Sequence, residues 1–159
     1  MTLSIDRDRL AHELEQLAAI SEVPSPAVTR IVFSAADLRA REFVKALCAG
    51  AGLAVRTDAV GNTFARWTGD APGLPAIGTG SHIDAIPNAG RYDGTVGVLG
   101  GLEAIRALQR RAFRPRCSIE LLIFTAEEPT LFGIGCLGSR FLAGQLDAVA
   151  GERLRDGQG

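Results

Sequence analysis

Several features that mark other classes of protein are missing from this sequence. No run approaches the roughly 20 apolar residues that a transmembrane helix needs, and the first residues, MTLSIDRDRL, contain no apolar signal core. The 17 basic and 18 acidic residues are intermixed, so there is no basic stripe for nucleic acid and no polybasic face for a membrane surface. The sequence therefore predicts no nucleic-acid partner, no membrane partner and a cytoplasmic location.

Cysteine is scarce, whereas glycine is abundant. The three cysteines, Cys48, Cys117 and Cys136, include no CxxC pair, which predicts reduced and mostly buried thiols. Most of the 19 glycines fall between Gly78 and Gly144, where tight turns or close backbone approaches are expected. A length of 159 residues with 47% hydrophobic residues suits one ordinary globular domain.

The first half of the chain predicts two amphipathic helices followed by two strands. Apolar residues recur at helical spacing in both helical segments, and Ser34 with Asp37 resembles a capping box at the start of the second. Gly50 is expected to end that helix, and Gly61-Asn62 is a turn signal between the strands. The predicted elements cover residues 6–20, 34–48, 53–57 and 63–67, with a loop over residues 21–30.

The second half predicts a strand, a helix and a second strand, followed by a short helix. These elements span residues 74–81, 95–109, 117–125 and 138–144. A buried strand, a helix and another buried strand are typical of a crossover in a parallel sheet, so the fold class is α/β. Because sites in such sheets gather at the carboxyl ends of strands, the residues that follow each strand are the candidates for chemistry.

The stretch FTAEEP places two adjacent carboxylates at the end of the second buried strand. Two like charges side by side repel one another unless water or a cation offsets them. Glu128 is therefore a candidate metal ligand, and Glu127 a candidate base that takes a proton from a metal-bound water. Adjacent side chains on a regular strand point in opposite directions, so this scheme requires the chain to leave strand geometry near Ala126.

The stretch SHIDAIPNAGRYDG follows the first buried strand and supplies the other candidates. In extended backbone Asp84 can reach His82, and a carboxylate that accepts one imidazole N–H leaves the other nitrogen free for a metal. Asp93, at a helix start, can bridge two cations. Alone, a His beside an Asp or a pair of glutamates is usually a solvated surface feature; together at two strand ends they favour a metal site.

Two longer blocks resemble a known family. GSHIDAIPNAGRYDGTVGVLGGLEAI and FTAEEPTLFGIGCLGSR are similar to the two signature blocks of the hydantoinase/carbamoylase branch of the dinuclear metallopeptidase and amidohydrolase superfamily. That branch includes N-carbamoyl-L-amino acid hydrolases, allantoate amidohydrolases and ureidoglycolate amidohydrolases. The resemblance is strongest to the last group, because the other two usually have glycine where Pro129 stands.

The resemblance implies a fold, a reaction and a role for each candidate. The fold would be a three-layer α/β/α metallopeptidase-like catalytic domain with a mixed, largely parallel sheet. Two divalent cations, Zn²⁺ or Mn²⁺, would support hydrolysis of a linear carbamoyl or ureido amide C–N bond in a small-molecule substrate through a metal-bridging hydroxide. His82 would then be a ligand of one metal, Asp93 the bridging ligand and Glu128 a ligand of the other metal. Glu127 would be the general base, and Asp84 the partner of His82.

The family also implies features that this sequence modifies or omits. A cis peptide is common after the bridging aspartate, here Asp93-Gly94, and Leu131 stands where arginine is usual. Family enzymes are homodimers more than twice this long, with a lid and dimerisation domain and two more ligand histidines downstream, whereas the other histidine here is His12. Residues 1–159 are therefore expected to be the N-terminal part of the catalytic domain. An aminopeptidase or dipeptidase of the same superfamily and a catalytically incomplete fragment stay as alternatives.

Overall fold

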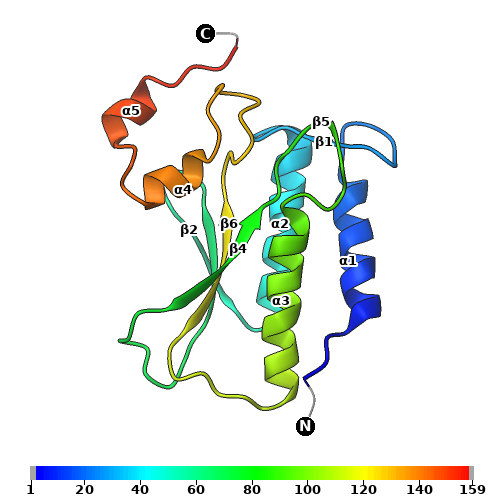
Figure 1. The fold of residues 1–159 in the computed structure, drawn as a ribbon, viewed down its shortest axis with the longest axis vertical. Coiled ribbons are helices and arrows are strands. Elements are labelled where there is room, and N and C mark those ends of the chain that lie inside the picture. Colours follow the sequence, from blue (N-terminus) through cyan, green and yellow to red (C-terminus); the bar gives the residue numbers. More distant parts are fainter. Residues whose placement is uncertain (1–2, 158–159) are drawn as a thin grey trace.

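A four-stranded mixed sheet forms the centre of the part of the chain that the computed structural model describes, residues 3–157 (Figure 1). The strands run in the order β2-β3-β6-β4, with β4 and β6 parallel and the other two pairs antiparallel. Each strand corresponds to a predicted one, and the two later strands are shorter than predicted. Their bounds are Ala54–Thr57 for β2, Thr63–Trp67 for β3, Ile77–His82 for β4 and Ile119–Phe124 for β6.

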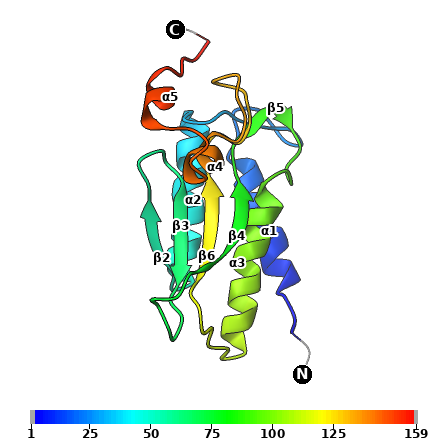
Figure 2. The same cartoon turned by 60° about the vertical axis from the view of Figure 1, so that its left-hand side comes forward.

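Three long helices lie on one face of this sheet: two of them pack against the strands, and the first packs against the other two (Figure 2). They are the predicted ones, α1 (Arg7–Ala19), α2 (Ala35–Gly50) and α3 (Thr95–Arg110). Their apolar stripes meet the strands in a core that includes Leu17, Val44, Leu99, Leu121 and Ile123, all at most 2% exposed. Helix α3 connects the parallel strands β4 and β6, which confirms the predicted crossover.

The glycines of α3 allow this helix to lie very close to the sheet. A Cβ on Gly97 would overlap the side chain of Ser81, and one on Gly101 would overlap that of Leu121. Two positions one helical turn apart thus face the strands without side chains. Part of the high glycine content therefore serves the close contact between α3 and the β4-β6 pair.

The mixed sheet with helices packed beside it confirms the predicted α/β fold class, and the described residues form part of the expected layers. Within residues 3–157 one strand pair of three in this sheet is parallel, and α1 to α3 all lie on the same face. Strand β4, predicted as buried, is an edge strand whose Ile77 is 62% exposed. A run of apolar and small residues is compatible with burial, but it contains no information on whether a neighbouring strand or layer covers it.

Three short elements were not predicted. Strands β1 (Val28–Arg30) and β5 (Ala85–Ala89) form a separate antiparallel pair in segments that the sequence suggested were loops. After α4 (Leu137–Leu142), which matches the predicted helix at 138–144, a further turn of helix forms α5 (Ala148–Glu152). Elements this short have little periodicity and depend on contacts distant in sequence. Within the described residues no helix combines the length and hydropathy of a membrane span.

A buried carboxylate joins α1 to α3 at the end of the molecule that carries the N-terminus. Glu103 is fully buried and accepts hydrogen bonds from the backbone N–H of Asp6 at 2.7 Å, from Arg9 and from Arg110 at 2.8 Å. Burial alone would raise the pKa of Glu103, but these hydrogen bonds and charges outweigh it and lower the pKa. Glu103 is thus a structural residue.

Replacing Glu103 by Gln should lower the free energy of unfolding at pH 7 by about 2 kcal/mol, because charge-assisted hydrogen bonds are lost at a buried group. The pKa of Glu103 is depressed in the folded protein, so its contribution is present above about pH 4.5 and is lost as the pH falls below that value. Urea unfolding at pH 7 and pH 3 measures both effects. Glu42→Gln is the control, since Glu42 is 75% exposed, and equal losses in both variants would contradict the account.

Candidate metal centre

The parallel pairing of β4 and β6 brings two distant parts of the sequence to the same edge of the sheet. The register ends with His82 beside Phe124, so the residues that follow both strands emerge side by side. Helix α3 starts at this same end, near the loop that contains Asp93 (Figure 1). The sheet topology therefore positions the candidates that the sequence predicted.

The backbone at Ala126 turns the two adjacent glutamates toward one site. Ala126 has a φ of 50°, in the left-handed region that residues other than glycine seldom adopt. This conformation ends the strand geometry of β6, as the sequence analysis required. Carbonyl oxygens of Ala126 and Glu127 accept hydrogen bonds from the N–H groups of Leu137 and Cys136, at 2.9 and 2.7 Å, which hold the turn in place.

One donor atom from each of His82, Glu127 and Glu128 lies within 4.8 Å of the others. The Nε2 atom of His82 is 3.5 Å from a carboxylate oxygen of Glu127 and 3.8 Å from one of Asp93. His82 is buried, whereas the Asp93 side chain is 69% exposed. The predicted imidazole thus lies close to the predicted carboxylates, with Glu127 and Glu128 in the same donor group and Asp93 beside the imidazole.

Asp84 contacts both halves of the site in a way that differs from the expectation. The Nδ1 atom of His82 is 3.0 Å from the backbone carbonyl oxygen of Asp84 and 3.6 Å from its carboxylate. The carboxylate, 1% exposed at the residue level, instead accepts the backbone N–H of Glu127 at 3.3 Å and that of Glu128 at 3.0 Å. Because a carbonyl oxygen only accepts, Nδ1 carries a proton, and Nε2 is the ring nitrogen that faces the carboxylates of Glu127 and Asp93.

The charges of the cluster shift the pKa values of its members. Burial would lower the pKa of His82, but the hydrogen bond and charge of Asp84, together with the charge of Glu127, raise it to about 8. Burial raises the pKa of Glu128, and the neighbouring carboxylates of Glu127, Asp93 and Asp84 raise it further against the opposing effect of His82. Negative charge is therefore concentrated around a single imidazole.

These donors fit a divalent cation. Imidazole nitrogen and carboxylate oxygen are ligands that suit zinc and manganese. The raised pKa of Glu128 shows that its charge is disfavoured when only protein groups surround it, and a cation would offset this repulsion. The second nitrogen of His82 is held by a backbone carbonyl, an arrangement that orients metal-binding histidines.

Gly94 is explained by its contact with the imidazole, and the family's cis peptide is not seen here. Within the described residues the cis peptide bond is at Ser25-Pro26, so the bond after Asp93 is trans. Gly94 has a φ of 63°, and a Cβ there would overlap the ring of His82. Glycine is required at this position because the loop passes directly against the ligand candidate.

Cys136 also contacts the site. Its Sγ donates a hydrogen bond to Glu127 at 3.4 Å, and its φ of 61° is again left-handed. The hydrogen bond to Glu127, together with burial, raises the pKa of the thiol, which therefore keeps its proton. No sequence signal indicates a cysteine in this conformation, and only the spacing of nine residues from Glu127 hints at proximity.

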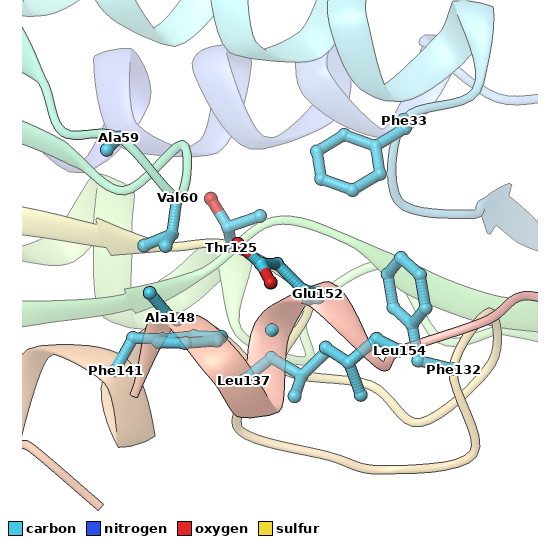
Figure 3. Close-up of a pocket in the computed structure, with 13 residues that line it drawn as sticks. Phe33, Ala59, Val60, Thr125, Phe132, Leu137, Phe141, Ala148, Glu152 and Leu154 are labelled. Carbon is cyan, nitrogen blue, oxygen red and sulfur yellow. The ribbon is translucent and has the colours of Figure 1, made fainter. Parts of the chain in front are cut away.

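A separate apolar cavity of about 460 Å³ lies beside Thr125, which follows β6 (Figure 3). It shares Thr125 and Ala126 with the end of β6, but none of the metal-ligand candidates lines it. Its walls are mainly aromatic and aliphatic and include Phe33, Phe132, Phe141, Leu137 and Leu154. This lining offers no cluster of metal donors, so the cavity is separate from the donor group of His82, Glu127 and Glu128.

A family model and several known proteins match this chain. The family model for "Peptidase family M28" matches residues 62–153. A ureidoglycolate hydrolase of Arabidopsis thaliana is 56% identical over 143 residues, which are 90% of this chain and 30% of the relative. An N-carbamoyl-L-amino acid amidohydrolase of Geobacillus stearothermophilus is 37% identical over 155 residues, which are 98% of this chain and 38% of the relative.

A solved structure, a hydantoinase/carbamoylase family amidase from Burkholderia ambifaria, superposes with a TM-score of 0.96 at 35% identity over 100% of this chain and 39% of its own. The chain thus spans only about a third of the length of these relatives. The family resemblance that the two sequence blocks carry is confirmed, and the chain belongs to peptidase family M28.

Proposed function

We propose that this chain is part of a metal-dependent amidohydrolase that cleaves a linear carbamoyl or ureido amide C–N bond. The observation that carries the proposal is the meeting of His82, Glu127 and Glu128 at the carboxyl ends of two parallel strands. Relatives named ureidoglycolate hydrolase and N-carbamoyl-L-amino acid amidohydrolase support this substrate class. The substrate would be a small molecule of the ureidoglycolate, allantoate or N-carbamoyl amino acid type.

Residues 1–159 would form the N-terminal part of the catalytic domain. The similarity covers most of this chain but only 30% of the Arabidopsis protein, which supports an enzyme with further segments. Those segments would supply the lid and dimerisation domain, the other metal ligands and a homodimeric assembly. A cytoplasmic location is part of the same proposal, and the three free cysteines support it.

Within this chain, His82, Asp93 and Glu128 would hold the metal ions. Asp93, with the most exposed of these side chains, would bridge two cations, and His82 and Glu128 would each bind one. Zn²⁺ or Mn²⁺ suits this mixture of imidazole and carboxylate ligands. When bound, the ions would polarise the substrate carbonyl and lower the pKa of the attacking water.

Glu127 would move the proton. Its carboxylate is 35% exposed, lies 3.5 Å from the imidazole of His82 and is held by the thiol of Cys136. In hydrolysis the water oxygen bonds to the carbonyl carbon, the C–N bond breaks, and the leaving nitrogen needs a proton. Glu127 would accept that proton from the water and deliver it to the nitrogen. Asp84 would keep the glutamate backbone and His82 in fixed relative positions.

The name of the matching family model favours a second candidate, an aminopeptidase or dipeptidase. The same metal ligands and base would then act on a peptide bond. The relatives named as amidohydrolases make this the weaker candidate. Peptide amides tested beside ureido and carbamoyl substrates separate the two.

The isolated chain should bind Mn²⁺ or Zn²⁺ weakly and with less than full occupancy, because it supplies only part of the proposed ligand set. Isothermal titration should show that Glu128→Gln lowers this affinity by at least about tenfold, the lower bound seen when even outer-shell groups are lost. Glu120→Gln is the matched control, since Glu120 lies on β6 and pairs with Arg66. Unchanged affinity in Glu128→Gln would contradict the ligand assignment.

A chimera tests the reaction. This chain replaces the matching segment of the Arabidopsis relative, to which it is 56% identical over 143 residues, and ammonia release from ureidoglycolate, allantoate and N-carbamoyl amino acids is measured with Mn²⁺. We expect metal-dependent turnover, and a fall in kcat of about 10² to 10⁴-fold in Glu127→Gln, the contribution of a general base. The isolated chain should show no turnover.

Two results would refute the assignment in the chimera. One is a folded, metal-binding chimera that cleaves peptide amides but no ureido or carbamoyl substrate. The other is full activity in Glu127→Gln. Glu120→Gln is again the control and should retain the activity of the parent chimera, because this side chain lies away from the carboxyl end of β6.

A further inference from the structure

Asn62 lies buried directly behind the glutamate pair. The sequence suggested only a turn at Gly61-Asn62, but the Asn62 side chain is 1% exposed and its amide makes three hydrogen bonds. Its oxygen accepts the N–H of Thr125 at 3.0 Å, and its nitrogen donates to Asp58 at 2.9 Å and to the carbonyl of Gly138 at 3.0 Å. One side chain thus ties the β2-β3 loop to the end of β6 and to α4.

The bond to Thr125 replaces a missing backbone partner. The pairing of β3 with β6 ends at Thr63 and Ile123. Beyond this pair the Asn62 amide takes the N–H of Thr125, the residue immediately before the left-handed Ala126. The N–H of Thr125 is therefore paired by a side chain and not by the backbone of β3.

Gly138 completes the arrangement from the other side. Its N–H donates to the carbonyl of Thr125 at 2.9 Å. A Cβ at Gly138 would overlap the Oδ1 atom of Asn62 and the backbone of Thr125, so only glycine fits. Thr125 is thus held through its N–H by Asn62 and through its carbonyl by Gly138.

We infer that Asn62 is a positioning residue for Glu127 and Glu128. The left-handed backbone of Ala126 is costly for a residue with a side chain and persists only where its surroundings impose it. On the N-terminal side of Ala126, Asn62 fixes Thr125. On the C-terminal side of Ala126, Asp84 accepts the N–H groups of the two glutamates. Metal ligands need positions held within about 0.5 Å. The expected effect of Asn62 on metal affinity rests on the proposed function. The claim that Asn62 holds the backbone of the two glutamates does not.

Hydrogen exchange followed by NMR tests the structural claim directly. In Asn62→Ala, hydrogen exchange of the Glu127 and Glu128 amides should accelerate about tenfold, the ratio that corresponds to the free energy of one buried hydrogen bond. Asn62 does not contact these two amides, so faster exchange there would report the position of the turn. Mn²⁺ affinity, measured by titration, should fall by about tenfold as well. Should Asn62→Ala not fold, Asn62→Asp keeps the side-chain shape, but it loses both donated bonds and sets a second carboxylate against Asp58. The side chain is then no longer held toward Thr125, so the same amides should again exchange faster.

Ser118→Ala is the matched control. Ser118 is fully buried at the opposite end of β6, where its hydroxyl accepts from the N–H of Gly69 at 3.2 Å and from Arg66 at 2.8 Å. This variant should lose stability without changing exchange at Glu127 and Glu128 or the metal affinity. Unchanged glutamate exchange in the Asn62 variants, or equal acceleration in Ser118→Ala, would overturn the inference. The wild-type chain could bind no metal while the Asn62 variants still exchange the Glu127 and Glu128 amides faster than Ser118→Ala does. That result would contradict the proposed metal centre but support the role of Asn62 in positioning the two glutamates.

Discussion

The left-handed backbone at Ala126 is the constraint on which the site depends. Two adjacent residues at a strand end cannot both face one site while the strand continues, because alternate side chains point to opposite faces. The φ of 50° at Ala126 removes that limit, at a cost of the order of 1 to 2 kcal/mol for a residue with a Cβ. Hydrogen bonds on both sides of Ala126 hold this geometry: the N–H of Thr125 donates to Asn62, and the N–H groups of Glu127 and Glu128 donate to Asp84.

Asp84 links this turn to the other strand end. Its backbone carbonyl orients the imidazole of His82, and its carboxylate accepts the N–H groups of both glutamates. The relative position of imidazole and carboxylates therefore depends on one buried residue, rather than on contacts between the ligand candidates themselves. The parallel pairing of β4 and β6 supplies the framework, and the glycines of α3 let the crossover helix pack closely against it.

Much of this arrangement could be predicted from the sequence, and the parts that could not have physical reasons. Regular periodicity located the long helices and the four sheet strands, and the order of strand, helix and strand placed His82 near Glu127. The sequence also required a departure from strand geometry near Ala126. The edge position of β4, the pairing of β1 with β5, and the side-chain bonds of Asn62 arise from contacts between distant segments, which leave no local pattern.

The most direct test of the central claim is where a paramagnetic ion binds. Mn²⁺ added to ¹⁵N-labelled protein broadens the amide signals nearest to it, without any need for turnover. Binding at the carboxyl ends of β4 and β6 predicts that the amides of His82, Gly94, Glu127 and Glu128 broaden at the lowest Mn²⁺ concentration. Broadening that begins instead around exposed acidic residues of α1, such as Glu15, would contradict the account.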